Sequence, residues 1–140
     1  FVKRDLSEGT LHAIDAKAKV IVAVPSLDTG VCALETKTFN AKLGQKAGVE
    51  CVIVSKDLPF AIKRFCEAEG VDNVESGSDF RGDFVEQYNT LMTSGPLQGL
   101  SARAVFVVDA QNNITYSELV PEITQEPNYD AVLKAIDELV

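Results

Sequence analysis

The sequence contains few of the residues that disulfide scaffolds, metal sites and nucleic-acid-binding surfaces need. Its 140 residues include 3 Cys, 1 His and 13 Lys plus Arg, against 21 Asp plus Glu, for a net charge of −8. Three cysteines are too few, and odd in number, for a disulfide-built scaffold, and no Cys-x-x-Cys pair or His cluster offers a zinc site. The acidic balance also argues against binding to nucleic acid or to an anionic membrane surface.

Long hydrophobic runs are absent as well. A membrane-spanning helix needs roughly 20 apolar residues, whereas the longest runs here are Val20–Pro25 and Ala104–Val108. A content of 46% hydrophobic and 24% charged residues is ordinary for a soluble globular protein. We therefore expect residues 1–140 to form one domain in the cytoplasm, and because the sequence opens on Phe1 without an initiator Met, we expect further residues upstream.

The first half of the chain alternates strand and helix patterns. Val20–Val24 is a β-branched run ended by Pro25, which is typical of a strand buried on both faces. A helix is predicted over residues 31–47, with one apolar face. The predicted face is formed by Leu34, Phe39 and Leu43.

The pattern then repeats. Residues 49–54 form a second short apolar run, and Asp57 is positioned to cap a helix that contains an early proline and runs to Gly70. Glycines and a proline are frequent between residues 70 and 101, so we expect mostly loop there, with one short helix near residues 83–88.

The last third predicts a hairpin and a closing helix. Residues 104–109 and 114–119 are strand-like, and the Asn-rich link at 110–113 is typical of a turn. A final helix over residues 129–139 is predicted to bury its apolar positions, Val132, Ile136 and Leu139. Together these elements predict an α/β protein of thioredoxin-like layout, with a central mixed β-sheet flanked by helices.

Cys32 is the leading candidate for a reactive group. It is expected in the first turn of the helix after the first buried strand, where unpaired backbone N–H groups and the helix dipole stabilise a thiolate. The thiolate is the nucleophilic form of cysteine. From position alone, a small buried cysteine under the sheet is an equally good interpretation.

The segment around Cys32 resembles a known active-site loop. Pro25-Ser26-Leu27-Asp28-Thr29-Gly30-Val31-Cys32 is similar to the active-site loop of the peroxiredoxins, in which a proline and then a threonine three positions before the cysteine precede the reactive thiol. Within that family, the sequence of this loop most resembles that of the bacterial thiol peroxidase subfamily. Further segments agree in the same order: Ser55 to Ala61, Arg64 to Cys66, Gly95 to Ala104 and Glu122 to Pro127.

Two other residues suit peroxide chemistry. Attack by a thiolate on a peroxide expels a poor leaving group, so the site must orient the peroxide and donate hydrogen bonds to the departing oxygen. The Thr29 hydroxyl can accept and donate, and Arg103 supplies a permanent charge and a planar set of donors. Without Cys32 and Arg103 in the same sequence, Thr29 is better explained as a plain helix cap. Without the resemblance, Arg103 is equally an exposed residue at a strand end, and Pro25 can be a simple strand terminator rather than a shield for the sulfur.

The resemblance also implies the second half of the reaction. In the thiol peroxidase subfamily, a cysteine at the place of Cys66 condenses with the sulfenic acid that forms on the reactive cysteine, within the same chain. By itself, Cys66 is better explained by core packing. Cys51, inside an apolar strand run, is interpreted as a small buried hydrophobe, and His12 as a surface residue.

The resulting hypothesis is a thiol-specific peroxidase that reduces hydrogen peroxide and organic hydroperoxides. A Cys32–Cys66 disulfide would be reduced by thioredoxin, with no metal or organic cofactor, and the resemblance implies a homodimer and a family β-hairpin ahead of Phe1. Two alternatives stay open: a binding or chaperone-like module of the same fold, and a general thiol–disulfide oxidoreductase. The lack of a Cys-x-x-Cys pair, and the Ala102-Arg103 dipeptide where thioredoxins carry a proline, argue against the oxidoreductase.

Overall fold

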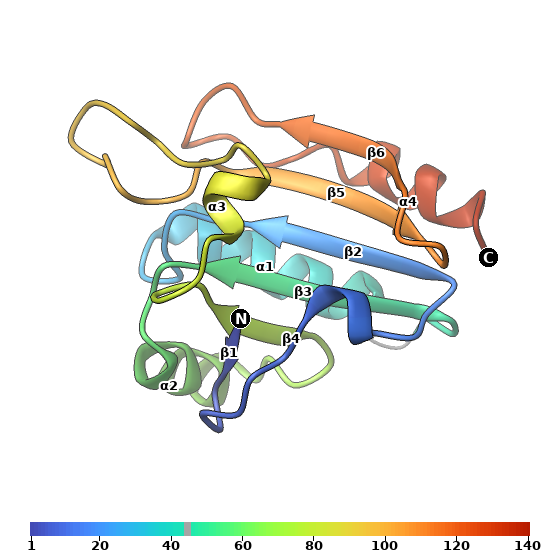
Figure 1. Cartoon of the computed structure of the whole chain (residues 1–140), viewed down its shortest axis with the longest axis horizontal. Coiled ribbons are helices and arrows are strands. Elements are labelled where there is room, and N and C mark those ends of the chain that lie inside the picture. The colour runs from blue at the N-terminus through green and yellow to red at the C-terminus, as the bar shows by residue number, and fades with distance from the viewer. Residues whose placement is uncertain (44–45) are drawn as a thin grey trace.

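The computed structural model, which describes residues 1–43 and 46–140, is organised around a six-stranded sheet of order β1-β4-β3-β2-β5-β6 (Figure 1). The strands are β1 (Val2–Lys3), β2 (Ala18–Ala23), β3 (Val49–Ser55), β4 (Glu75–Ser78), β5 (Ala104–Asp109) and β6 (Ile114–Leu119). The helices are α1 (Gly30–Leu43), α2 (Pro59–Glu69), α3 (Phe84–Gln87) and α4 (Tyr129–Asp137), with a 3-10 helix η1 (Leu11–Ala13).

The sheet is mixed, as predicted. β2 pairs in parallel with β3, and β3 with β4, so that α1 and α2 serve as the crossovers of two β-α-β units. β5 pairs antiparallel with both β2 and β6, and the predicted hairpin of β5 and β6 is confirmed. All six residues of β2 are buried, which confirms the prediction of a central strand covered on both faces.

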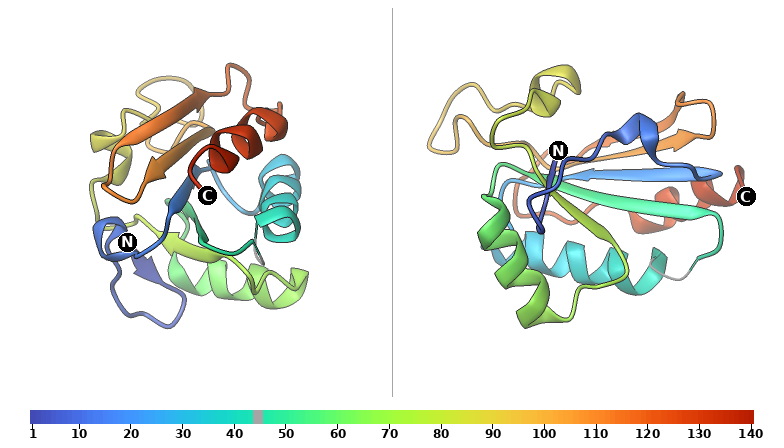
Figure 2. Two further views of the ribbon diagram at one scale, coloured as in Figure 1. Left: turned by 90° about the vertical axis from the view of Figure 1, so that its right-hand side faces the viewer. Right: turned by 60° about the horizontal axis from the view of Figure 1, so that its bottom comes forward.

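Three helices cover one face of the sheet and shorter segments cover the other (Figure 2). α1, α2 and α4 pack on the face that carries the larger buried cluster, to which both Cys32 and Cys66 belong. The opposite face is covered by α3, η1 and residues near the N-terminus. The two candidate cysteines therefore lie in the same apolar layer, on different helices.

The first helix differs from its prediction. α1 ends at Leu43 rather than at residue 47, and residues 44–45 of the predicted helix lie outside the described residues. Leu34 is 49% exposed, although Phe39 and Leu43 are buried. A spacing of five residues turns a helix by about 140° beyond a full turn, so Leu34 cannot share a face with Phe39. Positions 32, 36, 39 and 43 form the buried face, and Glu35 is buried with them.

Three further predictions are corrected. β4 lies in a stretch assigned to loop, because its sequence Glu-Ser-Gly-Ser lacks an apolar pattern, yet it pairs with β3 and β1. Leu58, not Asp57, precedes the first turn of α2, and no side chain in the described part of the protein caps that end. α4 ends at Asp137, and Leu139 lies beyond it, partly buried against the core.

Candidate active site

Cys32 is the third residue of α1 and is completely buried. The segment between β2 and α1 turns the chain from the central strand into the helix, and this brings the thiol to the N-terminal end of the helix. The Cys32 backbone N–H has no intrahelical partner at this position and instead donates to Thr29 Oγ1 at 3.4 Å. The prediction that Cys32 lies in the first turn is confirmed.

The Thr29 side chain links the loop to the helix. Its hydroxyl donates to the Ser26 carbonyl at 3.1 Å while its oxygen accepts the Cys32 N–H. Thr29 is exposed to solvent, so this hydroxyl lies at the entrance of the helix rather than in the core. It makes a capping contact with the Cys32 backbone, and its role toward peroxide stays a prediction.

The pairing of β5 with β2 brings Arg103 to the end of the sheet where the loop to Cys32 begins. Ala104, the first residue of β5, pairs with Ala23, the last residue of β2, so Arg103 lies beside the loop that begins after β2. Its side chain is only 1% exposed, which removes the exposed-arginine interpretation. Nη1 donates to Glu35 Oε2 at 2.5 Å and Nη2 to the Ile123 carbonyl at 2.7 Å.

The electrostatics join Arg103 to the thiol. Burial of the guanidinium lowers its pKa, but the hydrogen bond and charge of Glu35, followed by the charge and hydrogen bond of Cys32, outweigh burial and raise the pKa of Arg103. Arg103 is therefore a permanent cation against the Cys32 side chain. Its Nε–H is buried and has no hydrogen-bond partner among the described residues, so this donor can serve a further acceptor.

Glu35 is the site residue that sequence reasoning missed. Its carboxyl is 0% exposed, and burial raises its pKa to about 7 despite the opposing hydrogen bond and charge of Arg103. A signal was present, because Glu35 stands four positions before the apolar Phe39 and therefore on the same helix face. An acid on a buried face needs a cation as its partner.

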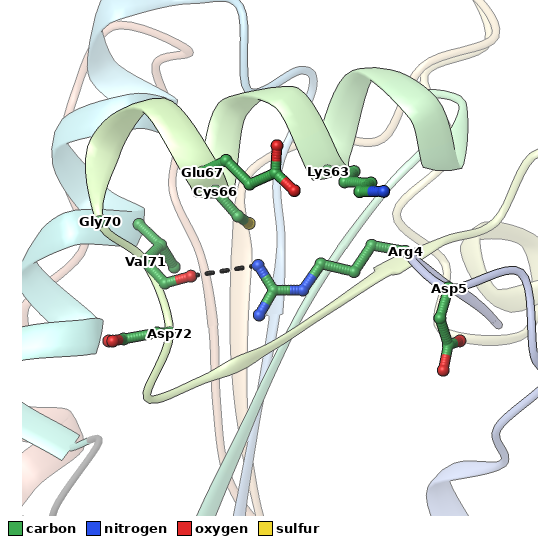
Figure 3. Close-up of a pocket in the computed structure, with 8 residues that line it drawn as sticks. All are labelled: Arg4, Asp5, Lys63, Cys66, Glu67, Gly70, Val71 and Asp72. Atoms are coloured by element: carbon green, nitrogen blue, oxygen red, sulfur yellow. Dashed lines mark hydrogen bonds between the residues drawn. The ribbon is translucent and has the colours of Figure 1, made fainter.

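Cys66 lies on the second helix, away from these contacts. Its side chain is 2% exposed, and its Sγ donates to Ser76 Oγ at 3.5 Å. Cys32, Cys51 and Cys66 are all free thiols. Cys66 lies at the base of a surface depression of about 520 Å³, across which Arg4 reaches to donate to the Val71 carbonyl at 3.3 Å (Figure 3).

The remaining residues singled out from the sequence fall into two groups. Pro25 is buried at the start of the Cys32 loop. Cys51 is 4% exposed in the middle of β3, and burial raises the pKa of its thiol, which fits the predicted inert core residue; His12 is exposed. Across residues 1–43 and 46–140, no helix is long and apolar enough to cross a membrane.

A thiol at a helix N-terminus beside a buried arginine, on a sheet of this topology, defines a thioredoxin-fold redox protein. A model of the Redoxin family matches residues 1–133. A thiol peroxidase of Leptospira interrogans is 53% identical over 137 residues, which are 96% of this chain and 80% of the relative. A thiol peroxidase of Aquifex aeolicus is 48% identical over 139 residues, covering 99% and 82%.

Solved structures agree. The crystal structure of a peroxiredoxin-like protein from Aquifex aeolicus superimposes with a TM-score of 0.95 at 47% identity, over 99% of this chain and 81% of that one. The chain belongs to the Redoxin family, as a peroxiredoxin enzyme of the thiol peroxidase type. The family resemblance seen in the sequence is thus confirmed.

Proposed function

We propose that this enzyme reduces hydrogen peroxide and organic hydroperoxides through a sulfenic acid on Cys32. The observation that carries the proposal is the free Nε–H of Arg103, a buried donor next to the thiol. A buried cation with an unused donor stabilises both a thiolate and the oxygen atoms of a bound peroxide.

The first chemical step uses three groups. The Cys32 thiolate attacks one peroxide oxygen, the O–O bond breaks, and the electron pair leaves on the other oxygen, which is protonated to water or an alcohol. Arg103 stabilises the charge on sulfur and on both oxygens, and the exposed Thr29 hydroxyl orients the incoming peroxide. Pro25, buried at the base of the loop, shields the sulfur from bulk water. Cys32 is left as a sulfenic acid.

The second step converts the sulfenic acid on Cys32 into a disulfide that a reductant can reopen. The Cys66 thiolate attacks the sulfenic sulfur, hydroxide leaves as water after protonation, and a Cys32–Cys66 disulfide forms. Thioredoxin then supplies two electrons by thiol–disulfide exchange and returns both cysteines to thiols. Both thiols are free and lie in one apolar layer on different helices, and the helices open before the sulfurs meet, because a disulfide needs Cα atoms within about 7 Å.

The proposal also covers the domain organisation, the oligomeric state and the location of the enzyme. Residues 1–140 act as one thioredoxin-like domain in a cytoplasmic homodimer, with no metal or organic cofactor. Support for a dimer surface comes from Leu58 and Phe60, which are 53% and 67% exposed at the start of α2, next to the Cys32 loop. Light scattering on the eluted protein should give twice the monomer mass, and Phe60→Ser should reduce it toward one.

Hydroperoxide consumption by the purified protein, coupled to thioredoxin, tests the function. We expect the parent to consume hydrogen peroxide and a Cys32→Ser variant to lose turnover while retaining the circular dichroism spectrum of the parent, because a serine hydroxyl is not an anion at neutral pH. A parent that reduces disulfides but not peroxides would support the oxidoreductase, and one that does neither would support the binding module.

A further inference from the structure

The Asp57 carboxylate makes a set of contacts that the proposed chemistry does not use. It lies between β3 and α2, yet its strongest contacts reach across to the loop before α1. Oδ1 accepts from Ser26 Oγ at 2.7 Å, and Oδ2 accepts from the Leu27 N–H at 2.8 Å. Oδ2 also accepts from Ser55 Oγ at 2.8 Å. Hydrogen bonds to an ionised acceptor are among the strong ones in proteins.

These contacts continue to the reactive cysteine. The Ser26 carbonyl accepts from the Thr29 N–H at 3.2 Å and from the Thr29 hydroxyl at 3.1 Å. The same hydroxyl oxygen accepts from the Cys32 N–H at 3.4 Å. An unbroken series of hydrogen bonds therefore runs from Asp57 through Ser26 and Thr29 to the backbone of Cys32.

Asp57 is itself held in place by residues at the ends of two strands. Its N–H donates to Ser55 Oγ at 3.3 Å, and its carbonyl accepts from Ser78 Oγ, at the end of β4. The backbone of Asp57 is therefore held at the ends of β3 and β4, and its carboxylate is held at the end of β3 through Ser55 Oγ. A side chain that is anchored in this way can set the position of the loop whose backbone and hydroxyl groups it binds.

We propose that Asp57 is a positioning residue for the attack of Cys32 on peroxide. Its carboxylate holds the Ser26–Leu27 backbone so that the Thr29 hydroxyl and the first turn of α1 face the incoming peroxide in the correct geometry. Asp57 does not touch the substrate, and the proposal rests on the proposed peroxidase function. In-line attack is sensitive to misplacement, and an error of about 1 Å can cost about 100-fold in rate.

The test compares two reactions of the same sulfur. Peroxide attack needs an aligned Thr29 and Arg103, whereas alkylation by iodoacetamide needs the Cys32 thiolate but no alignment with those two groups. The chain has no Trp, so both reactions are followed by rapid quenching and intact mass, in a Cys66→Ser background that stops the reaction at one thiol. We expect Asp57→Ala to lower the peroxide rate constant at least about 10-fold and the alkylation rate constant far less.

Asp57→Asn provides the conservative variant. One amide oxygen still accepts the Leu27 N–H, and the Ser26 hydroxyl can rotate to accept from the amide nitrogen. We therefore expect the peroxide rate constant of this variant to lie between those of Asp57→Ala and the parent. A purely structural role would instead reduce the folded fraction, measured by circular dichroism, and leave the peroxide rate constant of the folded protein unchanged.

Asp79→Ala is the matched control. Asp79 is also a strand-end carboxylate, 2% exposed, which accepts from the Phe84 and Val85 N–H groups and pairs with Lys56 at 3.2 Å. We expect this variant to be less stable but to keep the parent ratio of the two rate constants. An Asp57→Ala ratio equal to that of the parent would overturn the positioning role, whereas a parent that does not react with peroxide at Cys32 would overturn the proposed function instead.

Discussion

Arg103 and Glu35 form a buried ion pair, in which Nη1 donates to Oε2 at 2.5 Å and the two side chains are 1% and 0% exposed. Because the Ile123 carbonyl takes Nη2, the plane of the guanidinium is fixed from two sides. The direction of the Nε–H, which has no partner among residues 1–43 and 46–140, is thereby fixed. Preorganised donors of this kind need no rearrangement during the reaction.

Glu35→Gln should change how stability depends on pH. The pKa of Glu35 is raised by burial to about 7 in the folded protein, from an ordinary value near 4.5. The folded state therefore binds this proton more tightly than the unfolded state, so the contribution of Glu35 to stability is complete below about pH 4.5 and is lost as the pH rises through 7. Relative to Glu35→Gln, the parent should lose up to about 1.4 kcal/mol of unfolding free energy per pH unit in that window.

Urea unfolding of both proteins at pH 5 and pH 8 measures this difference. Subtracting the variant from the parent cancels the other titrating groups, which the two proteins share. A difference that is the same at both pH values would mean that Glu35 titrates at its ordinary pKa in the folded protein.

Arg103→Lys should lose most of the peroxide rate although the charge is kept. A lysine ammonium has no planar set of donors, so it cannot hold Glu35 Oε2 and the Ile123 carbonyl while also donating to peroxide. We expect a fall of 10-fold or more, about the size seen when one transition-state donor is removed. The second-order rate constant with hydrogen peroxide measures it, and a value equal to that of the parent would exclude Arg103 from the reaction.

The sequence predicted most of what depends on local pattern. The strand–helix alternation, the hairpin and the position of Cys32 in a first turn follow from runs of apolar residues and from Pro25 and Gly70. The partners of Arg103 and Asp57 could not be predicted in the same way, because Glu35 and Ser26 meet them only after distant segments pack together. β4 was not predicted for a different reason: its pairing is made by the backbone, and its sequence, Glu-Ser-Gly-Ser, contains no apolar side chain that would mark a strand.

Cys66→Ser should expose Cys32 to overoxidation. Without Cys66, the sulfenic acid has no thiol partner within the chain, because Cys51 is buried inside the sheet at β3. Excess peroxide should then convert Cys32 to the sulfinic acid. Intact mass should show two added oxygen atoms in the variant under conditions where the parent shows only the loss of two hydrogens. Equal rates of oxygen addition in both proteins would show that Cys66 does not protect Cys32.

Disulfide formation should require both helices to open. Cys32 lies buried in the first turn of α1 and Cys66 lies buried in α2, with its Sγ donating to Ser76. A disulfide needs Cα atoms within about 7 Å and Cβ atoms that face each other, so we expect the first turn of α1 and part of α2 to unwind on oxidation. Local opening draws on the least stable segments, and α2 begins without a side-chain cap.

Hydrogen exchange on reduced and oxidised protein measures this opening. We expect the amides of residues 30–35 and 60–68 to exchange faster in the oxidised state, while those of β2 and β5 keep their protection because all of β2 and most of β5 are buried at the centre of the sheet. A Cys32→Ser variant treated with the same amount of peroxide is the control, since it cannot form the disulfide and should keep the reduced pattern. Equal protection of both helix segments in reduced and oxidised parent would mean that the two thiols meet without unwinding, and that the reduced fold already holds them close enough to bond.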